Sequence, residues 1–216
     1  MKVLVACEFS GTVRDEFLRL GHDAVSCDLL PTEKEGPHIQ GDVLDVLKAE
    51  RFDLMIAHPP CTYLTVAANR AFKEDPTRER EREREGAFKF AMQLFNADIP
   101  QICMENPMGY LNSHFRKPDQ TIHPWMFGDC VMKRTCLWLK NLPKLYWSVS
   151  FPRIPKPIYY RDGKPIHFVE ACRGYTGTGL QRWQVRSKTF PGIAHAMAVQ
   201  WGSDDEQYFF KKYEGN

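Results

Sequence analysis

The chain is organised around one stretch, Phe52–Leu64, which reads FDLMIAHPPCTYL. Its first half is a short apolar run typical of a buried strand, and Pro59 and Pro60 then remove backbone donors and stop further sheet pairing. Open α/β sheets bind their ligands at the carboxyl ends of parallel strands. We therefore expect the thiol of Cys61 to lie at the mouth of a cleft, where it could act as a nucleophile, although a free cysteine is more often a small buried hydrophobe.

With 216 residues, the chain is long enough for one substantial domain with its own core. Its net charge is only +2, but the segment from Lys133 to Lys188 is almost purely basic, with Asp162 and Glu170 as its only acids. Basic residues alternate there with Tyr and Trp, which favours contact with phosphates and stacking on bases. The alternative is an irregular appendage whose aromatic residues form a small core of their own.

The seven cysteines are an odd number, and no Cys-x-x-Cys spacing occurs. Neither a disulfide framework nor a zinc site is indicated, so we predict no metal. The apolar opening Val3–Cys7 is too short for a signal peptide, and no later run approaches a membrane span. These features predict a reduced, soluble, cytoplasmic protein without a membrane partner, and they leave its oligomeric state open.

The first thirty residues have the pattern of a ligand-binding α/β unit. Lys2–Cys7 predicts a buried strand, a turn containing Gly11 follows, and an amphipathic helix ends near Gly21. A second strand then ends in Asp28. This layout is typical of units that bind a nucleotide or a cofactor. The Asp28 carboxylate could accept hydrogen bonds from both hydroxyls of a ribose, and a role as a turn cap is equally compatible.

Polar residues also stand at other strand and loop ends. Asp42, early in a loop, could accept a hydrogen bond from an amine such as that of adenine, or it could cap the following helix. A strand over Ile99–Met104 ends in Glu105 and Asn106, and a proline stops it as in the earlier strand. If these two strands are neighbours, the carboxylate of Glu105 and the thiol of Cys61 face one pocket.

The remaining segments carry weaker signals. The run Arg78–Glu85 alternates Arg and Glu, which indicates a solvated helix face and not a nucleic-acid contact. The segment Tyr110–Met126 is interpreted as a loop and Lys133–Leu139 as a further strand. A helix is expected from Pro191 to Trp201, and its small residues would allow close packing.

Taken in order, these pieces resemble the cytosine-C5 DNA methyltransferase family, in a compact, phage-like form without a full target-recognition domain. The resemblance implies a Rossmann-like α/β sheet that uses S-adenosylmethionine, with helices on both faces and a small irregular insertion. It further implies a cofactor-binding catalytic domain over residues 1–139 and 187–201. Residues 140–186 would then be the substrate-recognition insertion, and residues 202–216 a C-terminal tail.

The motifs that carry the resemblance are Pro60-Cys61, Glu105-Asn106 and the turn that keeps Gly11 of a Phe-x-Gly-x-Gly pattern. The catalytic residues implied by the resemblance are Cys61, Glu105, Asn106 and Arg134, the last of which stands where the family has Gln-x-Arg-x-Arg. The residues implied to bind S-adenosylmethionine are Cys7, Glu8, Phe9, Ser10, Gly11, Asp28, Leu29, Asp42, Val43 and Pro59. Substrate contacts are expected from Pro60, Thr62, Arg182 and Arg186.

The chemistry that the resemblance implies starts from the weak nucleophilicity of cytosine C5. Attack of the Cys61 thiolate on C6 would make C5 electron-rich, while Glu105 meets N3 and the exocyclic amine and Arg134 meets O2. In duplex DNA the ring is stacked, so the target would be a flipped cytosine or a single strand. The sequence identifies no residue as the base that removes the C5 proton.

Three other functions remain open. The same transfer could act on RNA or on a free cytosine nucleotide. A methyltransferase-fold protein could bind nucleic acid without catalysis, although the presence of both Cys61 and Glu105 argues against it. A redox-active thiol protein is a further possibility, but the chain has no evident resolving cysteine.

Overall fold

The computed structural model describes residues 1–69, 72, 77–147, 154–157, 159–166 and 187–203. Arg182 and Arg186, which are predicted to contact the substrate, lie outside these residues. The chain divides into two compact units, described separately below. The first unit comprises Met1–Gly11, Ala24–Ile122 and Arg134–Lys144, and the second comprises Thr12–Asp23, His123–Lys133 and Leu145–Asn216.

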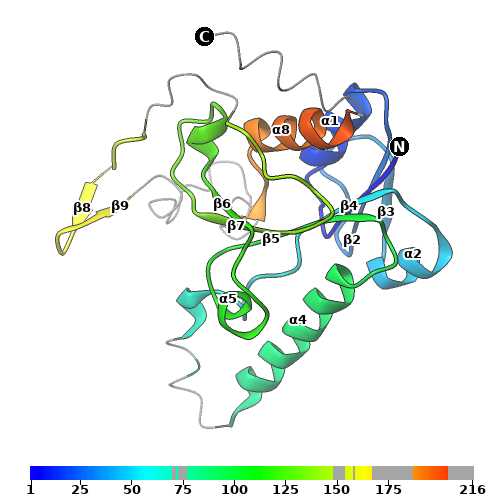
Figure 1. Cartoon of the computed structure of the whole chain (residues 1–216). Helices are drawn as coiled ribbons and strands as arrows, with labels where there is room; N and C mark the ends of the chain where they lie inside the picture. Colours follow the sequence, from blue (N-terminus) through cyan, green and yellow to red (C-terminus); the bar gives the residue numbers. More distant parts are fainter. Residues whose placement is uncertain (70–71, 73–76, 148–153, 158, 167–186, 204–216) are drawn as a thin grey trace. The chain divides into compact units, whose positions relative to one another are not determined.

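The first unit is built on a seven-stranded sheet with the strand order β3-β2-β1-β4-β5-β7-β6 (Figure 1). The strands are β1 (Lys2–Ala6), β2 (Asp23–Asp28), β3 (His38–Gln40), β4 (Leu54–Ala57), β5 (Gln101–Asn106), β6 (Gln120–Ile122) and β7 (Thr135–Lys140). β4 pairs in parallel with both β1 and β5, whereas β7 runs antiparallel to β5 and β6. The sheet and its flanking helices confirm the predicted Rossmann-like α/β fold.

Three helices of the first unit share one hydrophobic core with the sheet. They are α2 (Val43–Ala49), α4 (Glu79–Phe95) and α5 (Tyr110–His114), which contribute Val46, Leu94 and Leu111 among other buried side chains. All four residues of β4 are buried. The apolar run before the two prolines is therefore a central strand, as its composition predicts.

The interpretation of Tyr110–Met126 as a loop is wrong. This segment contains α5, β6 and most of the 3-10 helix η2 (Pro124–Phe127). Each of these elements is only 3 to 5 residues long, so hydrophobic periodicity cannot develop within it. Such short elements are held by the neighbouring strands and turns, which a sequence pattern does not display.

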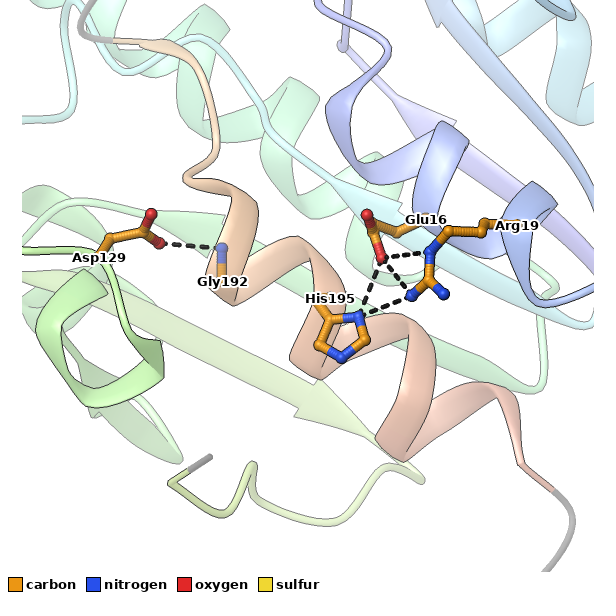
Figure 2. A network of polar contacts seen from close by, with 5 residues as sticks. All are labelled: Glu16, Arg19, Asp129, Gly192 and His195. Atoms are coloured by element: carbon orange, nitrogen blue, oxygen red, sulfur yellow. Dashed lines mark hydrogen bonds and ion pairs between the residues drawn. The ribbon is translucent and has the colours of Figure 1, made fainter. Parts of the chain in front are cut away.

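The second unit contains α1 (Thr12–Arg19) and α8 (Pro191–Gly202), which pack against each other. Figure 2 shows the polar network between them. Arg19 Nη2 donates to Glu16 Oε2 at 2.8 Å and lies 2.8 Å from His195 Nδ1, which in turn lies 3.0 Å from Glu16 Oε2. At the start of α8, the Gly192 N–H donates to Asp129 Oδ2 at 2.9 Å.

A β-hairpin of β8 (Tyr159–Arg161) and β9 (Lys164–Ile166) lies within the predicted insertion. Asp162 and Gly163 form its turn, with φ angles of 51° and 72°. Positive φ at both central residues is what a two-residue hairpin turn of type I′ requires. Part of the segment expected to be irregular is therefore regular, and the domain limits drawn from the sequence remain a prediction.

Candidate active site

The carboxyl ends of three adjacent strands meet at one edge of the sheet. β1 and β4 end in register at Ala6 and Ala57, and Ala57 is paired in turn with Met104 of β5. The residues that come next on the three strands are Cys7, His58 and Glu105. The strand that leads to Cys61 and the strand that carries Glu105 are therefore direct neighbours. This adjacency is the condition under which we expected the two side chains to face one pocket.

The loop after β4 is fixed by Asn106. The side-chain amide Nδ2 of this residue, which is only 1% exposed, donates to the backbone oxygen of Pro59 at 2.8 Å. Two residues on, Cys61 begins a tight turn in which its carbonyl oxygen accepts from the N–H of Leu64 at 3.0 Å and of Thr65 at 3.1 Å. Cys61 is partly exposed. Asn106 therefore braces the loop that presents the thiol.

His58 joins this loop to the carboxylate of Glu105. Its backbone N–H donates to the Ala6 oxygen at 2.9 Å, and its ring Nδ1 lies 3.3 Å from Glu105 Oε2. The side chains of His58 and Glu105 are only 9% and 17% exposed. The sequence motifs do not single out His58, although it occupies the position between a buried strand and two prolines.

Burial separates Cys61 from three of the other described thiols. It raises the pKa of Cys103 well above its ordinary value, with a smaller contribution from the charge of Glu105, and it is also the main cause of the raised pKa of Cys136. Burial, followed by the charges of Asp28 and Asp42, raises the pKa of Cys27 to about 11. These thiols stay protonated near neutral pH, and a protonated thiol is a poor nucleophile.

The turn predicted to bind the cofactor is tightly built. Cys7 and Gly11 both adopt positive φ, at 60° and 68°, and the chain turns sharply between them. Ser10 Oγ donates to Glu8 Oε1 at 3.1 Å, and both side chains are buried. Phe9 is also buried, and its carbonyl oxygen accepts from the Glu33 N–H at 2.9 Å. The turn therefore places a buried carboxylate at the exit of β1.

The acids predicted at the next strand and loop ends both act as caps. Asp28 Oδ1 accepts from the Leu30 N–H at 2.9 Å, and Asp42 Oδ1 accepts from the Leu44 N–H at 2.9 Å at the start of α2. Each carboxylate has a second oxygen, so capping is compatible with ligand binding. After burial, the charges of Asp28 and Asp42 further raise the pKa of Cys7, so both carboxylates act electrostatically on the exit of β1.

The two apolar residues predicted beside these acids differ in exposure. Leu29 is 74% exposed although it follows a buried strand, and it is among the most exposed large hydrophobic side chains described. Val43 is 4% exposed and belongs to the core beneath α2. Leu29 is therefore available to cover an apolar group at this edge, whereas Val43 holds the helix that Asp42 caps.

Comparison with known proteins gives matches among solved structures alone. No family model and no curated protein matches the sequence. Among solved structures, the chain is similar to a candidate DNA modification methyltransferase encoded within a prophage of E. coli, with a TM-score of 0.44 and 16% identity. The match covers 73% of this chain and 52% of that protein, so the chain spans about half of its length. We base the function on the residues of this chain.

Arg134 stands just before β7 and is exposed. Cys136, the second residue of β7, is paired with Asn106 of β5. Burial raises the pKa of Cys136, and hydrogen bonds with Thr121 and Asn112 lower it. Among the smaller effects, the charge of Glu105 raises this pKa and that of Arg134 lowers it. Arg134 therefore acts on the same part of the sheet as Glu105.

Arg84 of α4 is a second residue that the sequence analysis missed. Its Nε donates to the Tyr63 carbonyl oxygen at 2.9 Å and its Nη2 donates to Asn69 Oδ1 at 2.8 Å. The guanidinium also lies 3.5 Å from the centre of the Phe72 ring, in a cation–π contact. Arg84 thus anchors the segment that follows Cys61, although the alternating run predicts a solvated side chain at this position.

A groove with a volume of about 560 Å³ runs along α4. It starts at Pro60, beside Cys61, and its lining also includes Tyr63, Phe90 and Arg82. Pro60 and Thr62, both predicted to contact the substrate, are exposed on this loop. Among the described residues, no helix is long and apolar enough to cross a membrane, and no cluster of three His, Cys, Asp or Glu side chains could hold a metal ion.

Proposed function

We propose that this chain transfers a methyl group from S-adenosylmethionine to C5 of cytosine in DNA, through a transient covalent bond between Cys61 and C6. The observation that carries the proposal is the adjacency of β4 and β5, which brings the Cys61 loop and Glu105 to one edge of the sheet. The bond from Asn106 to Pro59 ties these two strand ends together. A thiol beside a carboxylate at such an edge suits nucleophilic catalysis on a ring that must be protonated.

Cys61 is the thiol best placed for this role. Cys7, Cys27, Cys103 and Cys136 all have raised pKa values, chiefly because they are buried. Cys61 is partly exposed, as Cys7 is, but only Cys61 of these two sits in a loop that two prolines stiffen. Arg134 is the positive charge that we propose to favour its thiolate.

In the proposed reaction, Cys61 is the nucleophile and Glu105 is the proton donor. Cys61 attacks C6, so the S–C6 bond forms and the electron pair of the C5–C6 double bond moves through the ring towards N3. Glu105 gives a proton to N3, and C5 then becomes electron-rich enough to take the methyl group. After transfer, a water molecule takes the C5 proton, which restores the double bond and breaks the S–C6 bond, so that Cys61 leaves as a thiolate and N3 returns its proton to Glu105.

The residues at the exits of β1 and β2 fit the chemistry of S-adenosylmethionine. That cofactor supplies a methyl group on a positively charged sulfur, and it also carries an ammonium group, ribose hydroxyls and an adenine amine. Glu8, Asp28 and Asp42 offer carboxylates to these cationic and hydrogen-bond-donating groups. The exposed side chain of Leu29 would cover the adenine, and Gly11 and Cys7 shape the turn.

DNA is the proposed substrate because of the basic and aromatic composition of residues 140–186. Lys156, Tyr160 and Arg161 are exposed in the described part of that segment, where they could meet phosphates and bases. We propose that the segment recognises the substrate and that Arg182 and Arg186 contribute to it. A stacked cytosine is out of reach, so the base would be flipped or in a single strand.

The test is mass spectrometry of nucleosides from the DNA of cells that express the protein. We expect 5-methylcytosine with the wild type and with Cys130→Ser, which removes an exposed thiol, and none with Cys61→Ser. If the wild type binds S-adenosylmethionine but leaves DNA unmodified, RNA and cytosine nucleotides are tested with labelled cofactor. If it binds no S-adenosylmethionine, methyl transfer is ruled out.

A further inference from the structure

A histidine lies between the two halves of the proposed site, and the proposed reaction gives it no role. His58 and Glu105 directly follow Ala57 and Met104, which are paired between β4 and β5. The ring Nδ1 of His58 lies 3.3 Å from Glu105 Oε2. This distance is at the long end for a hydrogen bond, as is common for catalytic groups before substrate binds. The contact joins an imidazole to a carboxylate of which only 17% is exposed.

The other ring nitrogen of His58 is buried and unsatisfied. Nε2 has no hydrogen-bond partner among the described residues, while the side chain is only 9% exposed. Leaving a buried polar atom unpaired costs about 1–3 kcal/mol. An apolar residue would avoid that cost, so a packing role alone does not account for a histidine at this position.

We propose that His58 is a positioning residue for Glu105, and that it determines which carboxyl oxygen gives its proton to cytosine N3. This inference rests on the proposed function. With its proton on Nδ1, the imidazole donates to Oε2, so the acid proton of Glu105 must stand on Oε1. The hydrogen bond also stabilises the carboxylate that remains after the proton has left.

Glu105 gives one proton to the ring and recovers it. When the Cys61 thiolate attacks C6, the O–H bond at Oε1 of Glu105 breaks and an N–H bond forms at N3. His58 keeps its Nδ1 proton and stabilises the negative charge on Oε2. When a water molecule takes the C5 proton, the S–C6 bond breaks, Cys61 leaves as a thiolate, and N3 returns its proton to Glu105.

The first test observes the histidine directly, without any need for activity. Nitrogen NMR of the labelled protein at mildly alkaline pH distinguishes the two neutral tautomers of an imidazole, and His58→Asn assigns the signal. We expect the proton on Nδ1, with Nε2 unprotonated. A proton on Nε2 would overturn the proposal, because Nδ1 could then not donate to Glu105.

The second test compares two variants in methyl transfer. His58→Asn keeps an N–H donor near the place of Nδ1, whereas His58→Gln places its amide near Nε2. We expect His58→Gln to lower kcat about 100-fold with the KM for DNA nearly unchanged, and His58→Asn to recover about 10-fold of that loss. Covalent trapping by DNA that contains 5-fluorocytosine should slow in the same order, because the adduct needs the proton at N3.

The two proposals fail in different ways. If the wild type makes no 5-methylcytosine but the proton is on Nδ1, the proposed function fails and the pairing of His58 with Glu105 stands. If the wild type is active and both variants keep its kcat, the positioning role is overturned while the methyl transfer stands. Equal losses in both variants would also overturn it, because the Nδ1 donor would then not matter.

Discussion

Two polar networks in this molecule differ in burial and in how completely their atoms are bonded. At the sheet edge of the first unit, His58 Nε2 and Asn106 Oδ1 are buried without a hydrogen-bond partner among the described residues. In the second unit, Glu16, Arg19 and His195 bond to one another while they are 26%, 54% and 50% exposed. The buried network carries a cost that folding alone does not require, and the exposed one carries almost none.

This difference predicts where substitutions act. Changes at the sheet edge should impair catalysis or the geometry that supports it, because each polar group there was buried at a cost. Changes in the α1–α8 network should alter stability slightly and leave chemistry intact.

The largest effect is expected at the nucleophile. Cys61→Ser should lower methyl transfer by about 10⁴-fold or more, because a serine hydroxyl is far less nucleophilic than a thiolate. Affinity for S-adenosylmethionine, measured by calorimetry, should stay within about twofold, since the proposed cofactor residues lie at other strand ends. A loss of cofactor binding in this variant would make Cys61 a structural residue.

Asn106→Ala removes the side chain that holds the loop before Cys61. The Nδ2 bond to the Pro59 oxygen is buried, so its loss should lower the free energy of unfolding by about 1–3 kcal/mol. Urea denaturation measures this change. Asn96→Ala, at an exposed position after α4, should change it by less than about 0.5 kcal/mol. An equal effect of the two variants would show that Asn106 does not brace the loop.

Arg84→Ala should act on activity through the segment that follows Cys61. The change removes two hydrogen bonds, to Tyr63 and Asn69, and the contact with Phe72. We expect kcat to fall about 10-fold, because the loop loses its fixed geometry. Lys89→Ala, which removes an exposed positive charge from the same helix outside the groove, is the control. If Lys89→Ala lowered kcat as much, the loss would reflect charge and not the anchoring of the loop.

The strand ends could be predicted from the sequence because each buried apolar run stops at a proline or an acid. The locations of Cys61 and Glu105 follow from that pattern. Asp42 was predicted early in a loop, and it does cap a helix as one alternative stated. The pairing of His58 with Glu105 could not be predicted, since it depends on which strands are neighbours. Arg84 was missed because an alternating charge run does not show which member turns inward.

The smallest effect concerns Glu16 in the second unit. Burial raises the pKa of this carboxyl, but hydrogen bonds from Arg19 and His195 outweigh it and hold the pKa below its ordinary value near 4.5. A carboxyl whose pKa is lowered in the folded state stabilises the fold at pH values above its unfolded pKa. That contribution is lost as the pH falls through the folded pKa.

Glu16→Gln tests this contribution to stability. Because the network is exposed and screened by solvent, we expect a loss below about 1 kcal/mol, or a Tm lower by about 2 °C near neutral pH. The difference in Tm between wild type and variant should shrink as the pH falls below the folded pKa of Glu16, where the wild-type carboxyl is also neutral. Glu85→Gln on the exposed face of α4 serves as the control and should leave Tm unchanged. If Glu16→Gln lost methyl transfer at unchanged stability, the exposed α1–α8 network would contribute to catalysis. That result would contradict the functional difference between this network and the buried one at the sheet edge.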